Sequence, residues 1–202
     1  LTAAEGYFLD RLLPEHVELE FLDPTRSYSV EKFILPSFLS RRFSGCLPTA
    51  YLDWFLPRVL PNRPRQSNRR ILISRRPTSR GRIRCILNED ELFAALEPHG
   101  FERLALEDLS MAEQIDLFYD ADVVIGAHGA GLTNLLFAQG AKVLELFPQD
   151  NVVPHYYFLC KAMGHDYAFC LGNGNHRKAN FRVDVEAVME SVQRLEAGSH
   201  HG

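Results

Sequence analysis

A glycine-rich turn in the stretch DVVIGAHGAGLTNLLF, residues 122–137, is the first candidate for chemistry. Gly126, Gly129 and Gly131 allow a sharp bend and close approach to a ligand, and free amides at the start of a following helix favour a phosphate. The spacing GxxGxG differs from the GxGxxG of dinucleotide folds, so a purely structural turn is an equal alternative. His128 could bond a phosphate or sugar, act as a base, or only shape its own loop.

Other polar residues accompany this turn. Thr133 and Asn134 stand on the first turn of the predicted helix, just after Ala130, where their side chains either cap the helix or touch a ligand. Glu145 is placed at the end of the next predicted strand, where an acidic residue in nucleotide-binding folds accepts hydrogen bonds from ribose hydroxyls. The alternative for Glu145 is an exposed carboxylate at a strand end.

Positive charge is concentrated on one short stretch, because seven arginines fall between Arg69 and Arg84. Guanidinium groups match phosphate oxygens bidentately and stay charged at every relevant pH. Arg75 directly follows an apolar strand and is the best-placed phosphate ligand, with Arg84 nearer the next helix. We expect most of the other arginines to be solvated.

Two further patterns resemble catalytic or metal-binding motifs. The letters HGAG also occur in the oxyanion loop of lipases, but the chain has no G-x-S-x-G nucleophile elbow. The Asp-Ala-Asp at residues 120–122 resembles a metal-binding motif of some sugar transferases, yet it precedes its strand and so lies at the wrong end of the sheet. We therefore interpret Asp120 as a helix-end residue and Asp122 as a strand start, and predict no metal site.

The elements that must position these residues follow an α/β pattern. Strands are predicted at 17–22, 30–35, 71–74, 101–106, 122–126, 142–147 and 167–171. Helices are predicted after Asn88 as N-cap, after a Ser110/Glu113 capping box, after the glycine turn and across 183–197. The run VVIG is apolar on both faces, which indicates a parallel sheet covered on both sides. We expect a Rossmann-like three-layer α/β domain over residues 61–197.

The first sixty residues fit this pattern less well. A stretch rich in Pro, Arg and Asn, residues 60–70, separates them from the regular α/β region, as an interdomain linker would. We interpret residues 1–60 as the remnant of an N-terminal domain with a crossover segment, and 198–202 as a tail or tag remnant.

Composition restricts the setting. The formal net charge of −4 argues against a general nucleic-acid binder, and no apolar run approaches the roughly 20 residues of a membrane-spanning helix. The four cysteines show no metal-ligand spacing and are too few for a disulfide scaffold, so we expect them to be buried and reduced in a cytoplasmic protein.

The ordered set ISR, ILNEDEL, GFERLALEDLSMAEQIDLFYDADVVIGAHGAGLTNLLF and AKVLELFP resembles the bacterial members of glycosyltransferase family 61, over about residues 30–167. The resemblance implies a GT-B architecture, inverting transfer from a nucleotide sugar that is often UDP-linked, and no required metal or other cofactor. Arg75 and Arg84 would face the diphosphate, residues 126–134 would line the donor pocket, and Glu145 would address the nucleoside. Bacterial members are commonly associated with capsular polysaccharide biosynthesis. Cys85 departs from the pattern by replacing a second basic residue.

The leading hypothesis is therefore the C-terminal, donor-binding half of an inverting hexosyl- or pentosyltransferase in polysaccharide or glycoconjugate synthesis. Its expected partners are a nucleotide sugar and a glycan or lipid-linked acceptor, which would bring it to a membrane surface. His128 is the candidate base, although the base could also lie in an N-terminal half outside this chain. The alternatives are a nucleotide-binding module without catalysis and, less favoured by the glycine spacing, a Rossmann-type oxidoreductase.

Overall fold

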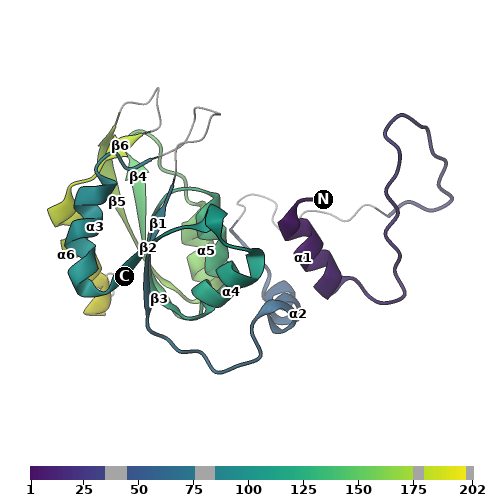
Figure 1. Cartoon of the computed structure of the whole chain (residues 1–202), viewed down its shortest axis with the longest axis horizontal. Helices are drawn as coiled ribbons and strands as arrows, with labels where there is room; N and C mark the ends of the chain where they lie inside the picture. Colours follow the sequence, from purple (N-terminus) through teal and green to yellow (C-terminus); the bar gives the residue numbers. More distant parts are fainter. Residues whose placement is uncertain (35–44, 76–84, 175–179, 199–202) are drawn as a thin grey trace.

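A six-stranded sheet forms the centre of the computed structural model, which describes residues 1–34, 45–75, 85–174 and 180–198 (Figure 1). The strand order is β2-β1-β3-β4-β5-β6. The strands are β1 (Arg69–Ser74), β2 (Phe101–Ala105), β3 (Ala121–Ala127), β4 (Lys142–Pro148), β5 (Asp166–Gly174) and β6 (Phe181–Arg182). Strands β1 to β5 pair in parallel and β6 pairs antiparallel with β5. The five predicted strands after residue 70 are confirmed.

Helices cover both faces of this sheet, as the sequence predicts for a three-layer α/β fold. Figure 1 shows α3 (Glu89–Leu96) and α6 (Val185–Glu196) on one face, with α4 (Met111–Tyr119) and α5 (His155–Met163) on the other. Helices α1 (Ala3–Leu12) and α2 (Thr49–Val59) lie beyond α4 and α5. Three 3-10 helices, η1 (Glu97–His99), η2 (Leu106–Asp108) and η3 (Ala130–Phe137), complete the described elements.

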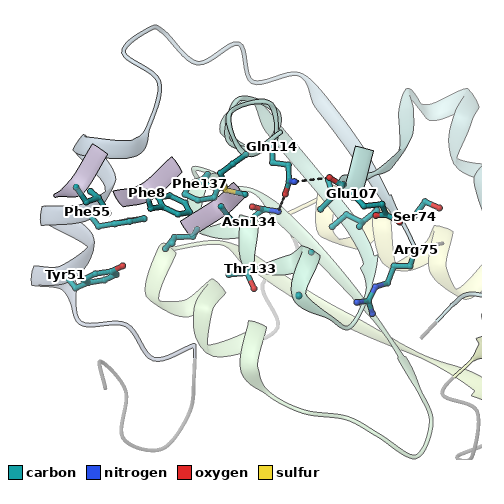
Figure 2. A pocket seen from close by; sticks show the side chains of 18 residues that line it. Phe8, Tyr51, Phe55, Ser74, Arg75, Glu107, Gln114, Thr133, Asn134 and Phe137 are labelled. Atoms are coloured by element: carbon teal, nitrogen blue, oxygen red, sulfur yellow. Dashed lines mark hydrogen bonds between the residues drawn. The ribbon is translucent and has the colours of Figure 1, made fainter. Parts of the chain in front are cut away.

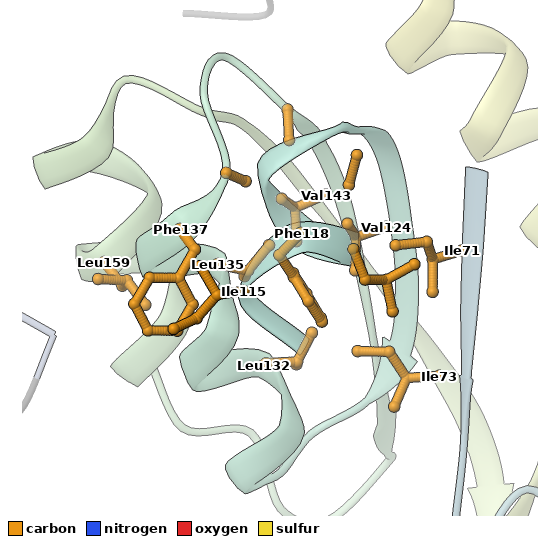
Figure 3. Packing of buried hydrophobic residues seen from close by; sticks show 14 of the residues in the cluster. Ile71, Ile73, Ile115, Phe118, Val124, Leu132, Leu135, Phe137, Val143 and Leu159 are labelled. Atoms are coloured by element: carbon orange, nitrogen blue, oxygen red, sulfur yellow. The ribbon is translucent and has the colours of Figure 1, made fainter. Parts of the chain in front are cut away.

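Alternating apolar residues in the strands divide the core into two clusters. Ile71 and Ile73 of β1 pack with Phe118 in the cluster beneath α4 and η3 (Figure 3). Leu72 points to the opposite face and packs with Leu92 of α3. Because side chains of a strand alternate between faces, a strand that is apolar throughout feeds both layers. Each fully buried Leu, Ile or Phe stabilises the fold by about 1.5–3 kcal/mol.

The two strands predicted before residue 36 are wrong for the residues that the structure describes. Residues 17–22 and 30–34 form no strand, and Phe21, Phe33 and Ile34 are more than 70% exposed. A strand needs a neighbour for its backbone hydrogen bonds, and no described segment pairs with either run. Instead α1 and α2 form in this region, and Phe55 and Val59 of α2 join the core beneath the sheet.

Two helix predictions need correction, while others are confirmed. Ser110 and Glu113 form the predicted capping box of α4, Asp120 caps the end of α4, and α6 covers most of the predicted C-terminal helix. Asn88 stands at the predicted N-cap position of α3, but its side chain makes no capping bond, because its amide donates to the Val183 carbonyl and accepts from the Val183 N–H, both at 2.9 Å.

The segment after the glycine turn is a 3-10 helix and not the predicted amphipathic α-helix. Bonds from Leu132 N–H to the Gly129 carbonyl and from Ala138 N–H to the Leu135 carbonyl have the i to i+3 spacing of that tighter helix. Leu132, Asn134, Leu135 and Phe137 are all buried. The more exposed positions Ala130, Thr133 and Leu136 are three residues apart and so share one face of a helix with three residues per turn.

The described helices include none with the length and apolar character needed to cross a bilayer. The assignment of residues 1–60 and 61–197 to separate domains stays a prediction.

Candidate functional site

A cavity of about 670 Å³ lies at the carboxyl edge of the sheet. Its walls come from the end of β1, from η2 and α4, from η3, and from α1 and α2. Of the predicted site residues it is lined by Arg75, Ala130, Gly131, Thr133 and Asn134 (Figure 2). In open parallel sheets this edge is where ligands bind, because the strand ends and helix starts leave polar backbone groups there.

Arg75 emerges from the end of β1 and turns toward the glycine turn. Its Nη1 donates to the backbone carbonyl of His128 at 3.1 Å. A Cβ atom on Gly129 would lie 2.3 Å from Arg75 Nη1, so the guanidinium rests directly on the Gly129 backbone. This contact brings an always-charged group to the start of η3, where backbone amides also favour negative charge.

The other glycines of the turn serve packing. A Cβ on Gly126 would lie 3.2 Å from the Ile73 Cβ in the neighbouring strand, and one on Gly131 would lie 3.1 Å from Leu106 Cδ1. These positions therefore fit the structural alternative for the turn, whereas Gly129 is needed for the approach of Arg75.

Asn134 and Gln114 form a hydrogen-bonded pair of side chains on the cavity wall. Asn134 Nδ2 donates to Gln114 Oε1 at 2.9 Å, and Gln114 Nε2 donates to the carbonyls of Leu106 and Leu109 (Figure 2). Thr133 Oγ1 lies 3.3 Å from the Tyr156 hydroxyl. Thr133 and Asn134 are thus bonded to side chains of neighbouring helices.

His128 and Glu145 are bonded to each other beneath the turn. His128 Nδ1 lies 2.5 Å from Glu145 Oε1, and the Tyr167 hydroxyl donates to Glu145 Oε2 at 2.7 Å. The imidazole stacks on Phe147 with ring centroids 5.2 Å apart. Glu145 is 0% exposed, so the alternative of an exposed carboxylate is wrong, and Glu145 lies within β4 and not at its end as predicted.

The charge of Glu145 affects its neighbours. Burial, reinforced by that charge and by the hydrogen bond, raises the pKa of Tyr167 far above its ordinary value. Burial and the same charge raise the pKa of Cys160 to about 12. Both groups therefore stay protonated around the carboxylate, and Tyr167 remains a donor to it.

The structure brings some predicted site residues together and separates others. Arg75 and the residues 129–134 share one rim, whereas His128 and Glu145 lie outside the lining of the cavity. Arg84 lies outside the described residues. Sequence reasoning missed Gln114 and Tyr167. Gln114 stands in the first turns of the predicted α4, next to a strand end, which is the only signal that could have drawn attention to it.

Among the described residues, no group of three or more His, Cys, Asp or Glu side chains is placed to hold a metal ion.

Fold and cavity together define an α/β protein with a cavity at the carboxyl edge of a parallel sheet. The sequence profile of glycosyltransferase 61 matches residues 6–144, most of the chain. The chain belongs to glycosyltransferase family 61.

Several curated relatives are similar to the chain. The EGF domain-specific O-linked N-acetylglucosamine transferase of Drosophila melanogaster is 38% identical over 103 residues, 48% of this chain and 19% of the relative. The protein of the same name in Mus musculus is 30% identical over 184 residues, 78% of this chain and 34% of the relative. The beta-1,2-xylosyltransferase of Arabidopsis thaliana is 29% identical over 124 residues, 54% of this chain and 22% of the relative. The chain thus spans about a third or less of the length of these relatives.

Proposed function

We propose that this chain binds the nucleotide-sugar donor of an inverting glycosyltransferase, with a UDP-linked sugar as the donor. Membership of family 61 supports transfer of a sugar as the activity of the protein. The names of its relatives point to N-acetylglucosamine and xylose as sugars to test first.

The contact of Arg75 with Gly129 is the observation that carries this proposal. It puts a guanidinium beside the first amides of η3 at the carboxyl edge of a parallel sheet. A diphosphate at this point would meet a bidentate cation and backbone N–H donors together. These groups would stabilise the charge that develops on the leaving nucleoside diphosphate during transfer.

In the proposed reaction a general base takes the proton of an acceptor hydroxyl, and the oxygen attacks the anomeric carbon. The bond between that carbon and the diphosphate oxygen breaks, and the nucleoside diphosphate leaves with the bond electrons. We keep His128 as the candidate base. Because Glu145 accepts a hydrogen bond from Tyr167 and faces His128 Nδ1, it would hold the Nδ1 proton in place and leave Nε2 as the basic atom. Both oxygens of Glu145 have partners, His128 and Tyr167. Glu145 would therefore orient His128 and would not contact the nucleoside.

The acceptor, the compartment and any role in capsular polysaccharide synthesis stay predictions. The names of the relatives above refer to EGF domains or to a beta-1,2-xylosyl linkage. These names support a protein or glycan acceptor for the proposal and do not support a lipid-linked one. The cytoplasmic setting and independence from metal likewise come from the sequence alone.

Isothermal titration calorimetry of the 202-residue chain with UDP, UDP-N-acetylglucosamine, UDP-xylose and NAD tests this proposal. We expect UDP and at least one UDP-sugar to bind and NAD not to bind. Arg75→Ala removes the charged hydrogen-bond donor and should weaken UDP binding roughly tenfold to a hundredfold. Binding of NAD without binding of UDP would overturn the proposal in favour of the oxidoreductase alternative.

A second candidate is a nucleotide-binding module that does not catalyse transfer by itself. It is favoured by the burial of His128, which stacks on Phe147 and does not line the cavity. This alternative predicts that the chain binds UDP-sugars but releases no UDP when acceptor glycans or EGF domains are added. Release of UDP that depends on an acceptor would exclude it.

A further inference from the structure

We propose that Gln114 is a positioning residue, which fixes the side-chain amide of Asn134 so that Oδ1 accepts a hydrogen bond from a carbohydrate hydroxyl in the cavity. The inference rests on the proposed function and adds to it a sugar subsite at the junction of α4 and η3. It starts from the hydrogen bonds that the two amides make with protein groups.

The orientation of Gln114 is fixed by the backbone. Gln114 Nε2 lies 2.9 Å from the Leu106 carbonyl oxygen and 3.0 Å from the Leu109 carbonyl oxygen. Two carbonyl oxygens can be satisfied only by the NH₂ end of an amide, because the oxygen end is an acceptor. The Oε1 end of Gln114 must therefore face the other way, toward η3.

This orientation dictates that of Asn134. Gln114 Oε1 is an acceptor, so the group that meets it at 2.9 Å must be Nδ2 of Asn134. Asn134 is only 7% exposed, so the surrounding residues restrict the rotation of its side-chain amide. Its Oδ1 consequently points away from Gln114.

Oδ1 of Asn134 is an acceptor that opens on the cavity. No residue in the described part of the chain donates a hydrogen bond to it. In that same part, Arg70 Nε is the only fully buried side-chain N or O without a partner, so Asn134 Oδ1 keeps some accessible surface. Asn134 and Gln114 both line the cavity (Figure 2). An acceptor that is oriented, unpartnered and not fully buried is able to take an O–H or N–H group from a ligand.

The rest of the cavity selects a carbohydrate as that ligand. A phosphate offers only acceptor oxygens and would repel Oδ1, so the diphosphate belongs beside Arg75. The wall on the far side from Arg75 is aromatic, with Phe8, Tyr51 and Phe55 (Figure 2). A sugar ring carries hydroxyl donors on its edge and apolar C–H groups on its faces, which matches an oriented acceptor next to aromatic rings.

The test is titration of UDP, UDP-N-acetylglucosamine and UDP-xylose into the wild-type chain and into Asn134→Ala. We expect Asn134→Ala to weaken binding of a UDP-sugar about threefold to tenfold, the effect of one hydrogen bond, and to change UDP binding less than about twofold. Equal weakening of UDP and UDP-sugars would assign the Asn134 contact to the nucleotide and overturn the proposal.

The source of the hydroxyl is distinguished by a second titration. If Asn134→Ala changes the binding of neither UDP nor the UDP-sugars, free N-acetylglucosamine and xylose are titrated in the presence of saturating UDP. Loss of that binding in Asn134→Ala assigns the hydroxyl to an acceptor sugar. No loss in either titration overturns the inference while leaving UDP binding, and so the proposed function, intact; a wild-type chain that binds no UDP overturns both.

Gln114→Met tests positioning separately from packing, because methionine keeps the length and removes both ends of the amide. We expect it to weaken UDP-sugar binding about twofold to fivefold in the wild-type background, since Asn134 is then free to turn over. In the Asn134→Ala background there is no amide left to position, so Gln114→Met should leave the ratio of UDP-sugar affinity to UDP affinity unaltered. It should still lower the thermal stability. The matched control is Gln193→Met on the exposed side of α6, which should alter neither. Equal effects of Gln114→Met on binding in both backgrounds would show a purely structural role.

Discussion

Arg75 lies across the backbone of Gly129, with its Nη1 bonded to the neighbouring carbonyl of His128 at 3.1 Å. Gly129 has extended backbone angles that any residue adopts. Glycine is therefore required here because a larger side chain would occupy the space of the Arg75 guanidinium, and not because of the backbone conformation. The absence of a side chain here lets a cation reach the start of η3.

Gly129→Ala should therefore separate binding from stability. The new Cβ would lie 2.3 Å from Arg75 Nη1, at the far end of a flexible side chain, so Arg75 moves and the fold remains. We expect a melting temperature close to that of the wild type and UDP binding weakened roughly tenfold or more, as for loss of a charged hydrogen bond. Calorimetry and thermal denaturation measure the two quantities.

Gly6→Ala is the matched control, because a Cβ at Gly6 meets no atom within 4 Å. It should leave UDP binding unchanged and stabilise α1 slightly. Unaltered UDP binding in Gly129→Ala would contradict the assignment of Arg75 to the phosphates.

Glu145 is expected to stabilise the fold through His128 and Tyr167. Glu145→Ala leaves the buried His128 and the partly buried Tyr167 without their acceptor and should lower the free energy of unfolding by about 2–4 kcal/mol. Glu145→Gln should lose less, since its oxygen can still face His128 Nδ1 and its NH₂ group can donate to the Tyr167 oxygen. Urea denaturation at neutral pH measures both. Equal stability of Glu145→Ala and the wild type would show that these bonds contribute nothing net.

The sheet and its helices could be predicted because the signal is local. Strands β1, β3 and β4 are short apolar runs between polar turns, and the Ser110 capping box marks the start of α4. Two missed helices also carried local signals. Leu52, Phe55 and Val59 have helical spacing in α2, and Thr2 with Glu5 forms a capping box at α1. The two-residue strand β6 offers no period to detect.

The site was predictable only in part, because its contacts depend on register. Pairing of Gly126 with Glu145 in adjacent parallel strands puts the carboxylate beneath the turn, next to His128. A one-residue slip would send Glu145 to the other face of the sheet. Sequence also could not show that the side chain of Asn88, the N-cap residue of α3, bonds to Val183, far along the chain, and makes no capping bond.

Asn88 is predicted to connect α3 to the segment before α6. Asn88→Ala leaves the buried N–H and carbonyl of Val183 unpaired and should reduce the free energy of unfolding by about 2–4 kcal/mol. Asn62→Ala, at an exposed position, should change it by less than about 0.5 kcal/mol. Chemical denaturation of both variants gives the comparison, and similar values for the two would refute the bridging role.

The four cysteines should differ in reactivity. The expectation that all are buried holds only for Cys160, because Cys46 is exposed and Cys85 and Cys170 are partly exposed. Because the thiolate is the reactive form, a pKa of about 12 protects Cys160 at pH 8. Mass spectrometry after iodoacetamide treatment should find Cys46 modified first and Cys160 modified only after unfolding. Early labelling of Cys160 in the folded protein would contradict its burial.

His165 should make the fold less stable in mild acid. Its Nδ1 accepts from the Ala141 N–H at 3.2 Å, so Nε2 carries the proton and donates to the Leu135 carbonyl at 2.9 Å, at the end of η3. Burial lowers the pKa of His165, with Arg65 adding to the shift and the Leu135 bond and Asp166 opposing it. Below about pH 6.5 the unfolded chain takes up a proton that the folded chain does not. The contribution of neutral His165 to the free energy of unfolding is therefore fully present above pH 6.5 and is lost as the pH drops toward the folded-state pKa.

The contribution of His165 is measured by urea denaturation between about pH 5 and pH 8, with a slope of up to about 1.4 kcal/mol per pH unit for one proton. His165→Gln cannot titrate and should lose this part of the acid dependence, while its stability at pH 8 falls because the two backbone bonds are weakened. His99→Gln, at an exposed position, should keep the wild-type slope. A wild-type slope in His165→Gln would mean that other histidines cause the acid sensitivity, and that His165 holds η3 without acting as a titrating group.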